Sequence, residues 1–84
     1  MKVVINKQPE KYMATLNVSD KGRIAEAIDK LELEPPEGDI EKLRGKKEKA
    51  YRLRVGDWRI LYKVKETYIA VYKIAPRGQA YNKE

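Results

Sequence analysis

One stretch decides the fold of this chain: Tyr51-Arg52-Leu53-Arg54-Val55-Gly56-Asp57-Trp58-Arg59-Ile60-Leu61-Tyr62. Two runs rich in β-branched and aromatic residues flank Gly56-Asp57. A Gly-Asp pair between two such runs predicts a two-residue hairpin turn with glycine at the first, positive-φ position. A turn of this length fixes the strand register, so Val55 faces Trp58 and Arg54 faces Arg59.

This register sorts the side chains of the hairpin onto two faces of the sheet. One face is predicted to be core and consists of Tyr51, Leu53, Val55, Trp58, Ile60 and Tyr62. The other face carries Arg52, Arg54 and Arg59. Arg54 opposite Arg59 is a like-charge pair, which costs stability unless an anion or a partner's carboxylate lies between the two. The fold gains nothing evident from it, so we expect a function there; the alternative is that Arg52 and Arg54 are only the polar side of a half-exposed strand.

Length and composition exclude several kinds of site. The 84 residues predict a single domain spanning residues 1–84. Cysteine and histidine are both absent, which removes disulfides, the usual zinc sites and Cys-His or Ser-His nucleophile pairs. We therefore expect no metal and no cofactor. The apolar run at the N-terminus is too short for a signal peptide or a membrane span, which predicts a soluble, cytoplasmic protein.

The net charge of +6 is distributed unevenly along the chain. Residues 1–41 hold six Lys/Arg and nine Asp/Glu, a net charge of −3, whereas residues 42–84 hold thirteen and four, a net charge of +9. A basic half attached to a mildly acidic half suggests that one surface meets a polyanion such as nucleic acid. Lys46, Lys47 and Lys49 lie in a basic loop before the hairpin and are candidate RNA-binding residues; the alternative is an ordinary solvated loop.

The remaining elements follow from periodicity and from breaking residues. We expect a first strand at Lys2–Ile5, a first helix at about residues 8–17 and a second helix capped by Ser19. The apolar stripe of the second helix consists of Ile24, Ala27, Ile28 and Leu31. Pro35-Pro36 ends the helical region, and the carboxylates of the linker 34–39 are expected only to aid solubility.

Beyond the linker, Ile40 and Leu43 predict a short turn packed on the core. Residues 67–74 predict a third long strand, in which a bulge near Lys73 would exchange the two faces and leave the side of Tyr72 open. The predicted fold is α+β: an N-terminal strand and a two-helix hairpin packed on one face of an antiparallel sheet of about four strands.

Nearly the whole chain resembles the RelE/ParE superfamily of toxins from type II toxin–antitoxin pairs, and in particular its RelE-like branch. The resemblance is carried by Lys42-Leu43-Arg44-Gly45, by the hairpin stretch quoted above and by Ile74-Ala75-Pro76-Arg77-Gly78-Gln79-Ala80-Tyr81. It implies a RelE-like fold, a cognate antitoxin as partner, and a ribosome-dependent endoribonuclease. In this branch messenger RNA is cut in the ribosomal A site without a metal, by attack of the ribose 2′-hydroxyl on the adjacent phosphate, and translation is inhibited.

The resemblance also implies roles for individual residues. Arg52 and Arg54 stand where the family has basic residues that engage the reacting nucleotide, and Arg59 where it has an arginine on the scissile phosphate. Arg77 matches the arginine that stabilises charge or serves the leaving 5′-oxygen, and Tyr81 the tyrosine that stacks on or orients the base. These residues suit the chemistry, because guanidinium groups supply bidentate donors to a phosphate and an aromatic ring offers a stacking surface.

One departure from the family concerns the general base. Some members have lysines where this chain has Arg52 and Arg54, and a guanidinium with a pKa above about 12 is a poor proton acceptor. Either the base comes from elsewhere, from Tyr81 or from the ribosome and its water, or the protein is slow or does not cleave. Tyr81 has a second interpretation as a packing anchor for the tail.

Two other functions remain open on the sequence alone. A ParE-like inhibitor would act on DNA gyrase by binding and would not need the convergence of arginines. A basic RNA-binding domain without toxicity would also account for the charge.

Overall fold

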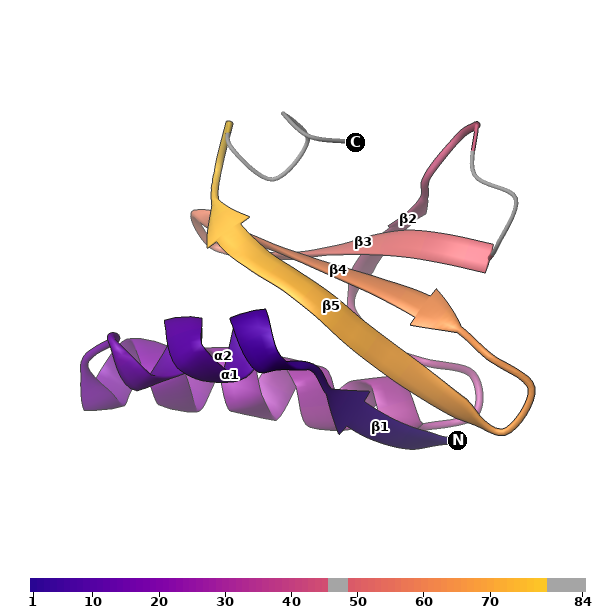
Figure 1. Ribbon diagram of the computed structural model, residues 1–84, viewed down its shortest axis with the longest axis horizontal. Helices are drawn as coiled ribbons and strands as arrows, with labels where there is room; N and C mark the ends of the chain where they lie inside the picture. The colour runs from indigo at the N-terminus through magenta and orange to yellow at the C-terminus, as the bar shows by residue number, and fades with distance from the viewer. Residues whose placement is uncertain (46–48, 79–84) are drawn as a thin grey trace.

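A computed structural model describes residues 1–45 and 49–78 of the chain. Two helices form one layer and the strands form the other, with the helices covering one face of the sheet (Figure 1). The elements in chain order are β1 (Lys2–Ile5), α1 (Lys7–Ala14), α2 (Val18–Asp29), the 3-10 helix η1 (Lys30–Glu32), β2 (Asp39–Lys42), β3 (Lys49–Val55), β4 (Trp58–Val64) and β5 (Tyr68–Pro76). The predicted α+β class is confirmed.

The sheet has five strands in the order β1-β5-β4-β3-β2. β1 joins the same sheet, as predicted, but it pairs in parallel with β5, so the sheet is mixed and not antiparallel throughout. The predicted hairpin register between β3 and β4 is confirmed, with Val55 opposite Trp58 and Arg54 opposite Arg59. Gly56 has φ of +57° and Asp57 has no positive φ, which is the backbone pattern of a turn with glycine at its first position.

The fifth strand is β2, and the prediction of a short turn there was wrong. Asp39–Lys42 pairs antiparallel with β3, with Asp39 opposite Arg54 and Glu41 opposite Arg52. Aspartate, glutamate and lysine have low strand propensity, so the local sequence gives a weak strand signal. Pairing with an already formed hairpin and partial burial of Ile40 against the core override that propensity.

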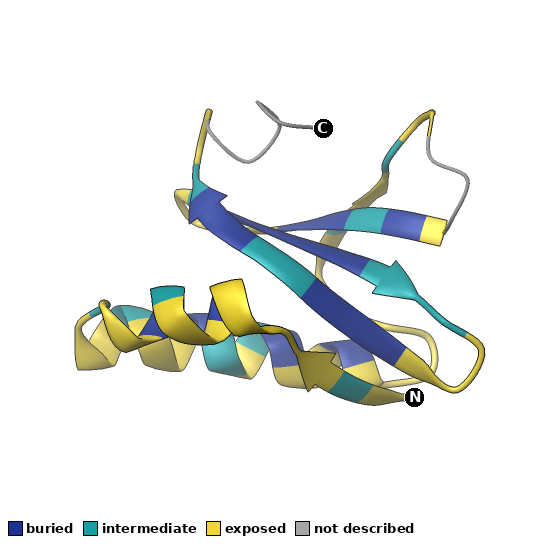
Figure 2. Ribbon diagram, in the orientation of Figure 1, coloured by how far each residue is buried: buried dark blue, intermediate teal, exposed yellow. Residues whose placement is uncertain are grey.

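The helices differ from the predictions at their ends. α1 stops at Ala14, three residues earlier than expected. α2 is capped by Asn17 and not by Ser19, because the Asn17 side chain accepts a hydrogen bond from the Asp20 backbone N–H at 2.8 Å. The predicted apolar stripe is confirmed: Ile24, Ile28 and Leu31 are buried in the core and Ala27 packs against it. Figure 2 shows buried segments alternating with exposed ones along the helices.

β5 contains a bulge, which the sequence suggested near Lys73 but did not decide. Leu61 pairs with Lys73 and Tyr62 pairs with Val71, so Tyr72 is the extra residue. Where β1 ends, a side chain continues the hydrogen bonding to β5: the Gln8 amide donates to the Ile74 carbonyl at 3.0 Å and accepts from the Ile74 N–H at 3.0 Å. This side chain fixes α1 against the sheet.

The core lies between the helices and one face of the sheet. Its central residues from the two layers are Ile24, Ile28, Leu31, Leu53, Ile60, Tyr62, Val71 and Ile74. The hairpin residues Arg52, Arg54 and Arg59 alternate with core residues and therefore lie on the face away from the helices. None of the helices in the described part of the chain is long and apolar enough to span a membrane.

Candidate functional site

The candidate site is the face of the sheet that points away from the helices. Arg52 and Arg54 of β3 and Arg59 of β4 share this face, as the hairpin register predicts. We call these three side chains the arginine face.

The three arginines differ in how far they reach solvent. The Arg54 side chain is 54% exposed, whereas Arg52 and Arg59 are buried, at 9% and 8%. Arg59 Nη1 donates to the backbone carbonyl oxygens of Gly56 at 3.3 Å and Trp58 at 3.1 Å, so this guanidinium is held over its own turn. Arg54 is therefore the arginine of this face that an incoming anion meets first.

Two carboxylates from β2 lie among the arginines. Asp39 Oδ2 is 2.7 Å from Arg54 Nε, and Asp39 Oδ1 is 3.7 Å from Arg52 Nη2. Glu41 Oε1 accepts a hydrogen bond from Arg52 Nη2 at 3.2 Å. The chain therefore supplies its own carboxylate to Arg54, on the side of β3 away from Arg59, where the sequence predicted only an anion or a partner's carboxylate between the two arginines.

Sequence reasoning missed both carboxylates because it missed β2. The signal was the alternation of Asp39 and Glu41 around the apolar Ile40, which puts both acidic side chains on one face of a strand. The expectation that the linker carboxylates only aid solubility was also wrong: Asp39 pairs with Arg54, and Glu34 lies 3.2 Å from the amino group of Met1.

The electrostatic balance of the face leaves room for a further acceptor. Arg52 Nε is buried and makes no hydrogen bond with any described residue. Arg54 is half exposed, so its guanidinium is open to a further acceptor beside Asp39. Glu41 is 72% exposed at its side chain, so its carboxylate can contact both Arg52 and a bound ligand.

Arg77 lies at the turn end of the sheet. It follows β5 directly, its residue is exposed, and its backbone N–H donates to the Asp57 carbonyl oxygen at 2.6 Å. Ala75, two residues before it, pairs with Arg59. The backbone of Arg77 is therefore held next to the turn that joins the two arginine-bearing strands.

The other predicted site residues are placed differently or lie outside the described residues. Lys49 is exposed at the start of β3 and pairs with Val64. By strand alternation it shares the face of Tyr51 and Leu53, so it is not brought together with the arginines. Lys46, Lys47 and Tyr81 lie outside the described ranges 1–45 and 49–78.

An aromatic ring lies on the same face, which the sequence left undecided. Lys63 shares the face of Arg59 by alternation along β4, and its Nζ is 5.0 Å from the centre of the Tyr72 ring. The bulge at Tyr72 brings this ring beside a cation on the arginine side of the sheet. Stacking of an unpaired base needs a ring of this kind next to positive charge.

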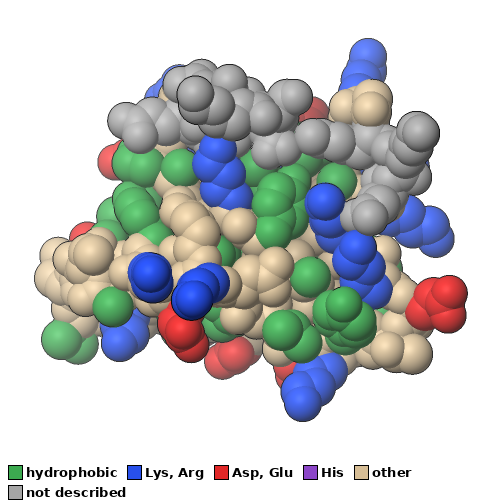
Figure 3. Space-filling model, in the orientation of Figure 1, with side chains coloured by type: hydrophobic (Ala, Val, Ile, Leu, Met, Phe, Trp, Pro, Cys, Tyr) green, Lys and Arg blue, Asp and Glu red, His purple; other side chains and the backbone are tan. Residues whose placement is uncertain are grey.

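Positive side chains are also exposed away from the arginine face, for example Lys7 and Lys11 of α1. Lys and Arg side chains are scattered between apolar side chains in the view of Figure 3. No group of three or more His, Cys, Asp or Glu side chains in the described residues could hold a metal ion. The arginine face thus offers charge stabilisation by guanidinium groups, two carboxylates as possible proton acceptors, and an aromatic ring.

Comparison with known proteins identifies the family. Residues 7–81 match the family described as the ParE toxin of the type II toxin–antitoxin system parDE. The fold is similar to a crystal structure of the archaeal RelE–RelB complex from Pyrococcus horikoshii OT3, with a TM-score of 0.78, 36% sequence identity, and coverage of 94% of this chain and 97% of that chain. No curated protein sequence matched. The sheet, the helix pair and these two likenesses agree with the resemblance seen in the sequence, and the chain belongs to the RelE/ParE superfamily of type II toxins, whose partner is a cognate antitoxin.

Proposed function

We propose that this toxin is a ribosome-dependent endoribonuclease that cuts messenger RNA in the ribosomal A site and so inhibits translation in the cytoplasm. The observation that carries the proposal is the arginine face, with three guanidinium groups on one side of a hairpin and two carboxylates among them. The 36% identity to the archaeal RelE of the RelE–RelB complex supports the RelE-like branch.

The arginines supply charge stabilisation in this reaction. Arg54 is half exposed, which suits a bidentate contact of its guanidinium with the scissile phosphate. Arg52 and Arg59 are buried beside it and add fixed positive charge that needs no rearrangement as negative charge develops on the phosphate oxygens. Arg77, at the turn end, serves the leaving oxygen, and Tyr81 orients the base.

In this proposal the carboxylate of Glu41 is the general base. It is exposed and next to Arg52, whereas the guanidinium groups are poor proton acceptors. In the proposed step the 2′-hydroxyl gives its proton to Glu41 while the 2′-oxygen forms a bond to phosphorus. The bond from phosphorus to the 5′-oxygen breaks, and that oxygen takes a proton from water, leaving a 2′,3′-cyclic phosphate and a 5′-hydroxyl.

Cleavage on programmed ribosomes tests the proposal. Messenger ends are mapped by primer extension for the wild type, for Arg54→Gln and for the charge-matched control Lys11→Gln, whose side chain is on α1. Removing one donor to a developing oxyanion costs about 10²–10³ in rate, so we expect Arg54→Gln to cut about 100-fold more slowly. Lys11→Gln should cut at the wild-type rate, because α1 lies on the other face of the sheet.

A ParE-like gyrase inhibitor is the second candidate, and the family match to ParE toxins favours it. Such an inhibitor would act by binding DNA gyrase and would perform no chemistry. Intact messages together with lost supercoiling in a gyrase assay would replace the first proposal with this one.

A further inference from the structure

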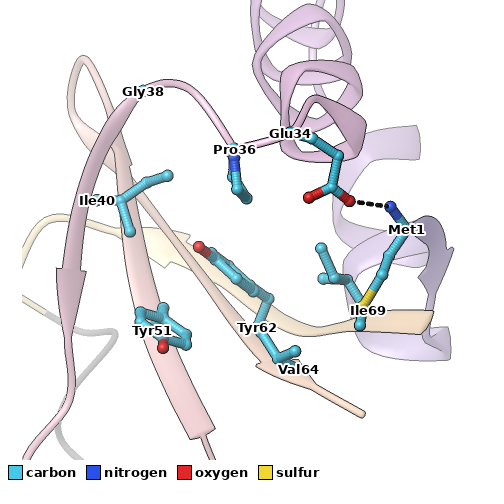
Figure 4. Close-up of a pocket in the computed structure, with 9 residues that line it drawn as sticks. All are labelled: Met1, Glu34, Pro36, Gly38, Ile40, Tyr51, Tyr62, Val64 and Ile69. Carbon is cyan, nitrogen blue, oxygen red and sulfur yellow. Dashed lines mark hydrogen bonds and ion pairs between the residues drawn. The ribbon is translucent and has the colours of Figure 1, made fainter. Parts of the chain in front are cut away.

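A pocket of about 380 Å³ lies on the helix side of the sheet, at the opposite surface from the arginine face. It runs between the β strands and the linker that joins the helices to β2, from Met1 and Ile69 on one side to Ile40 on the other (Figure 4). The proposed reaction uses none of the side chains that line it.

Two stacked tyrosines form one wall of this pocket. The rings of Tyr51 and Tyr62 lie 5.3 Å apart between centroids, with an interplanar angle of 18°. The Tyr62 hydroxyl points towards Pro36 and the linker (Figure 4). Burial, together with the nearby Tyr51, raises the pKa of Tyr62 to about 12, so the phenol keeps its proton at neutral pH. The pocket wall therefore contains a hydrogen-bond donor, the Tyr62 hydroxyl, among apolar side chains.

The pocket lacks the positive side chains that are common elsewhere on the protein. None of the described lysines or arginines lines it, although the chain carries a net charge of +6. The charged side chain at the rim is Glu34, which is 80% exposed and lies 3.2 Å from the Met1 amino group. The Met1 ammonium offsets the Glu34 carboxylate, so the rim offers no net positive charge to a phosphate group, and the apolar walls favour an uncharged group.

We propose that this pocket binds an apolar side chain of the antitoxin, with the Tyr62 hydroxyl donating a hydrogen bond to a backbone carbonyl beside that side chain. A polypeptide supplies both parts, an apolar side chain and a carbonyl acceptor next to it, and the antitoxin is the polypeptide partner of this family. A second copy of the toxin is a poorer occupant, because two chains of charge +6 repel each other. The inference rests on the family membership and not on ribonuclease activity.

Filling the pocket should weaken antitoxin binding. Val64 lines the pocket, so Val64→Trp places a large ring where the antitoxin side chain would enter. Val18→Trp is the matched control, since Val18 is 89% exposed on α2 and does not line the pocket. Titration calorimetry with the purified cognate antitoxin should show a Kd at least tenfold higher for Val64→Trp and an unchanged Kd for Val18→Trp.

A gentler variant and a direct contact measurement complete the test. Tyr62→Phe keeps the ring stack and removes only the donor, so we expect a Kd about three- to tenfold higher. In the wild-type complex, nuclear Overhauser effects should connect the methyl groups of Ile40 and Ile69 to an apolar side chain of the antitoxin. An unchanged Kd in both pocket variants with no such contacts would overturn the proposal, as would the same contacts arising between two toxin copies. A toxin that fails to cut RNA but shows these Kd changes would refute the proposed function and leave this inference standing.

Discussion

Replacing Asp39 by asparagine should make the toxin less stable and bind RNA more tightly. Asp39 contacts Arg54 at 2.7 Å and Arg52 at 3.7 Å, and Arg54 is the residue that faces the like-charged Arg59 across the hairpin. Its amide replacement keeps the size of the side chain and removes the charge. The repulsion between Arg54 and Arg59 is then no longer offset by the charge of Asp39. The guanidinium of Arg54 is also free to bind an external anion.

The stability change follows from the exposure of this ion pair. The side chains of Asp39 and Arg54 are 45% and 54% exposed, so water screens their attraction and the loss is about 1 kcal/mol at most. For a domain of this size, 1 kcal/mol lowers Tm by about 4–8 °C. The gain in RNA affinity has the same origin. If an RNA phosphate takes the place of the Asp39 carboxylate and restores the full interaction of about 1 kcal/mol with Arg54, the Kd for RNA falls about fivefold.

The matched control is Glu37→Gln, which removes one carboxylate from the linker at a position with no ion pair to any arginine of the described residues. Fluorescence anisotropy with a labelled single-stranded RNA, repeated over a range of KCl concentrations, measures the Kd and its salt dependence. One additional free cation steepens the slope of log K against log salt by about 0.7. If Asp39→Asn and Glu37→Gln bind RNA equally well, Asp39 does not compete with phosphate on this face and the assignment of the site fails.

Two further predictions concern stability. Gln8→Ala leaves the backbone N–H and carbonyl of the buried Ile74 without their hydrogen-bond partners. The free energy of unfolding measured by urea titration should therefore fall by about 2 kcal/mol. The control Lys7→Ala, one residue away, should change it little. Burial, with a smaller contribution from Tyr51, raises the pKa of Tyr62 from 10.0 to about 12, so the unfolded chain loses this proton at lower pH than the folded protein does. The stabilisation is therefore complete below about pH 10 and is lost as the pH rises to about 12, and Tyr62→Phe should lack this part of the decline in unfolding free energy. Parallel curves for the wild type and Tyr62→Phe would contradict the second prediction.

The hairpin was predictable because a short range of sequence determines it. Gly56-Asp57 fixes the turn, the turn fixes the register, and the register alone places Arg52, Arg54 and Arg59 on one face. β2 was not predictable from its own residues, since a short charged strand forms only where a neighbouring strand is already present to pair with it. The burial of Arg52 and Arg59 was missed for a related reason. The alternation of side chains along a strand assigns each one to a face of the sheet, but it does not say which side chains of other strands lie beside it on that face. The carboxylates that surround Arg52 belong to the strand that was missed.

The two surfaces of the sheet suit two different partners. On one face, the like-charged arginines are offset by the chain's own carboxylates, Asp39 and Glu41, which are partly exposed and can give way to phosphate. On the other face, a pocket with apolar walls carries at its rim the ion pair of Glu34 with the Met1 amino group, and no lysine or arginine side chain of the described residues lines it for a phosphate to bind. An antitoxin anchored at the pocket would leave the arginine face to be covered by a separate segment of the same polypeptide. Binding through two linked contacts makes the second contact intramolecular, so a modest anchor at the pocket strengthens the overall complex without any additional contact to the arginines.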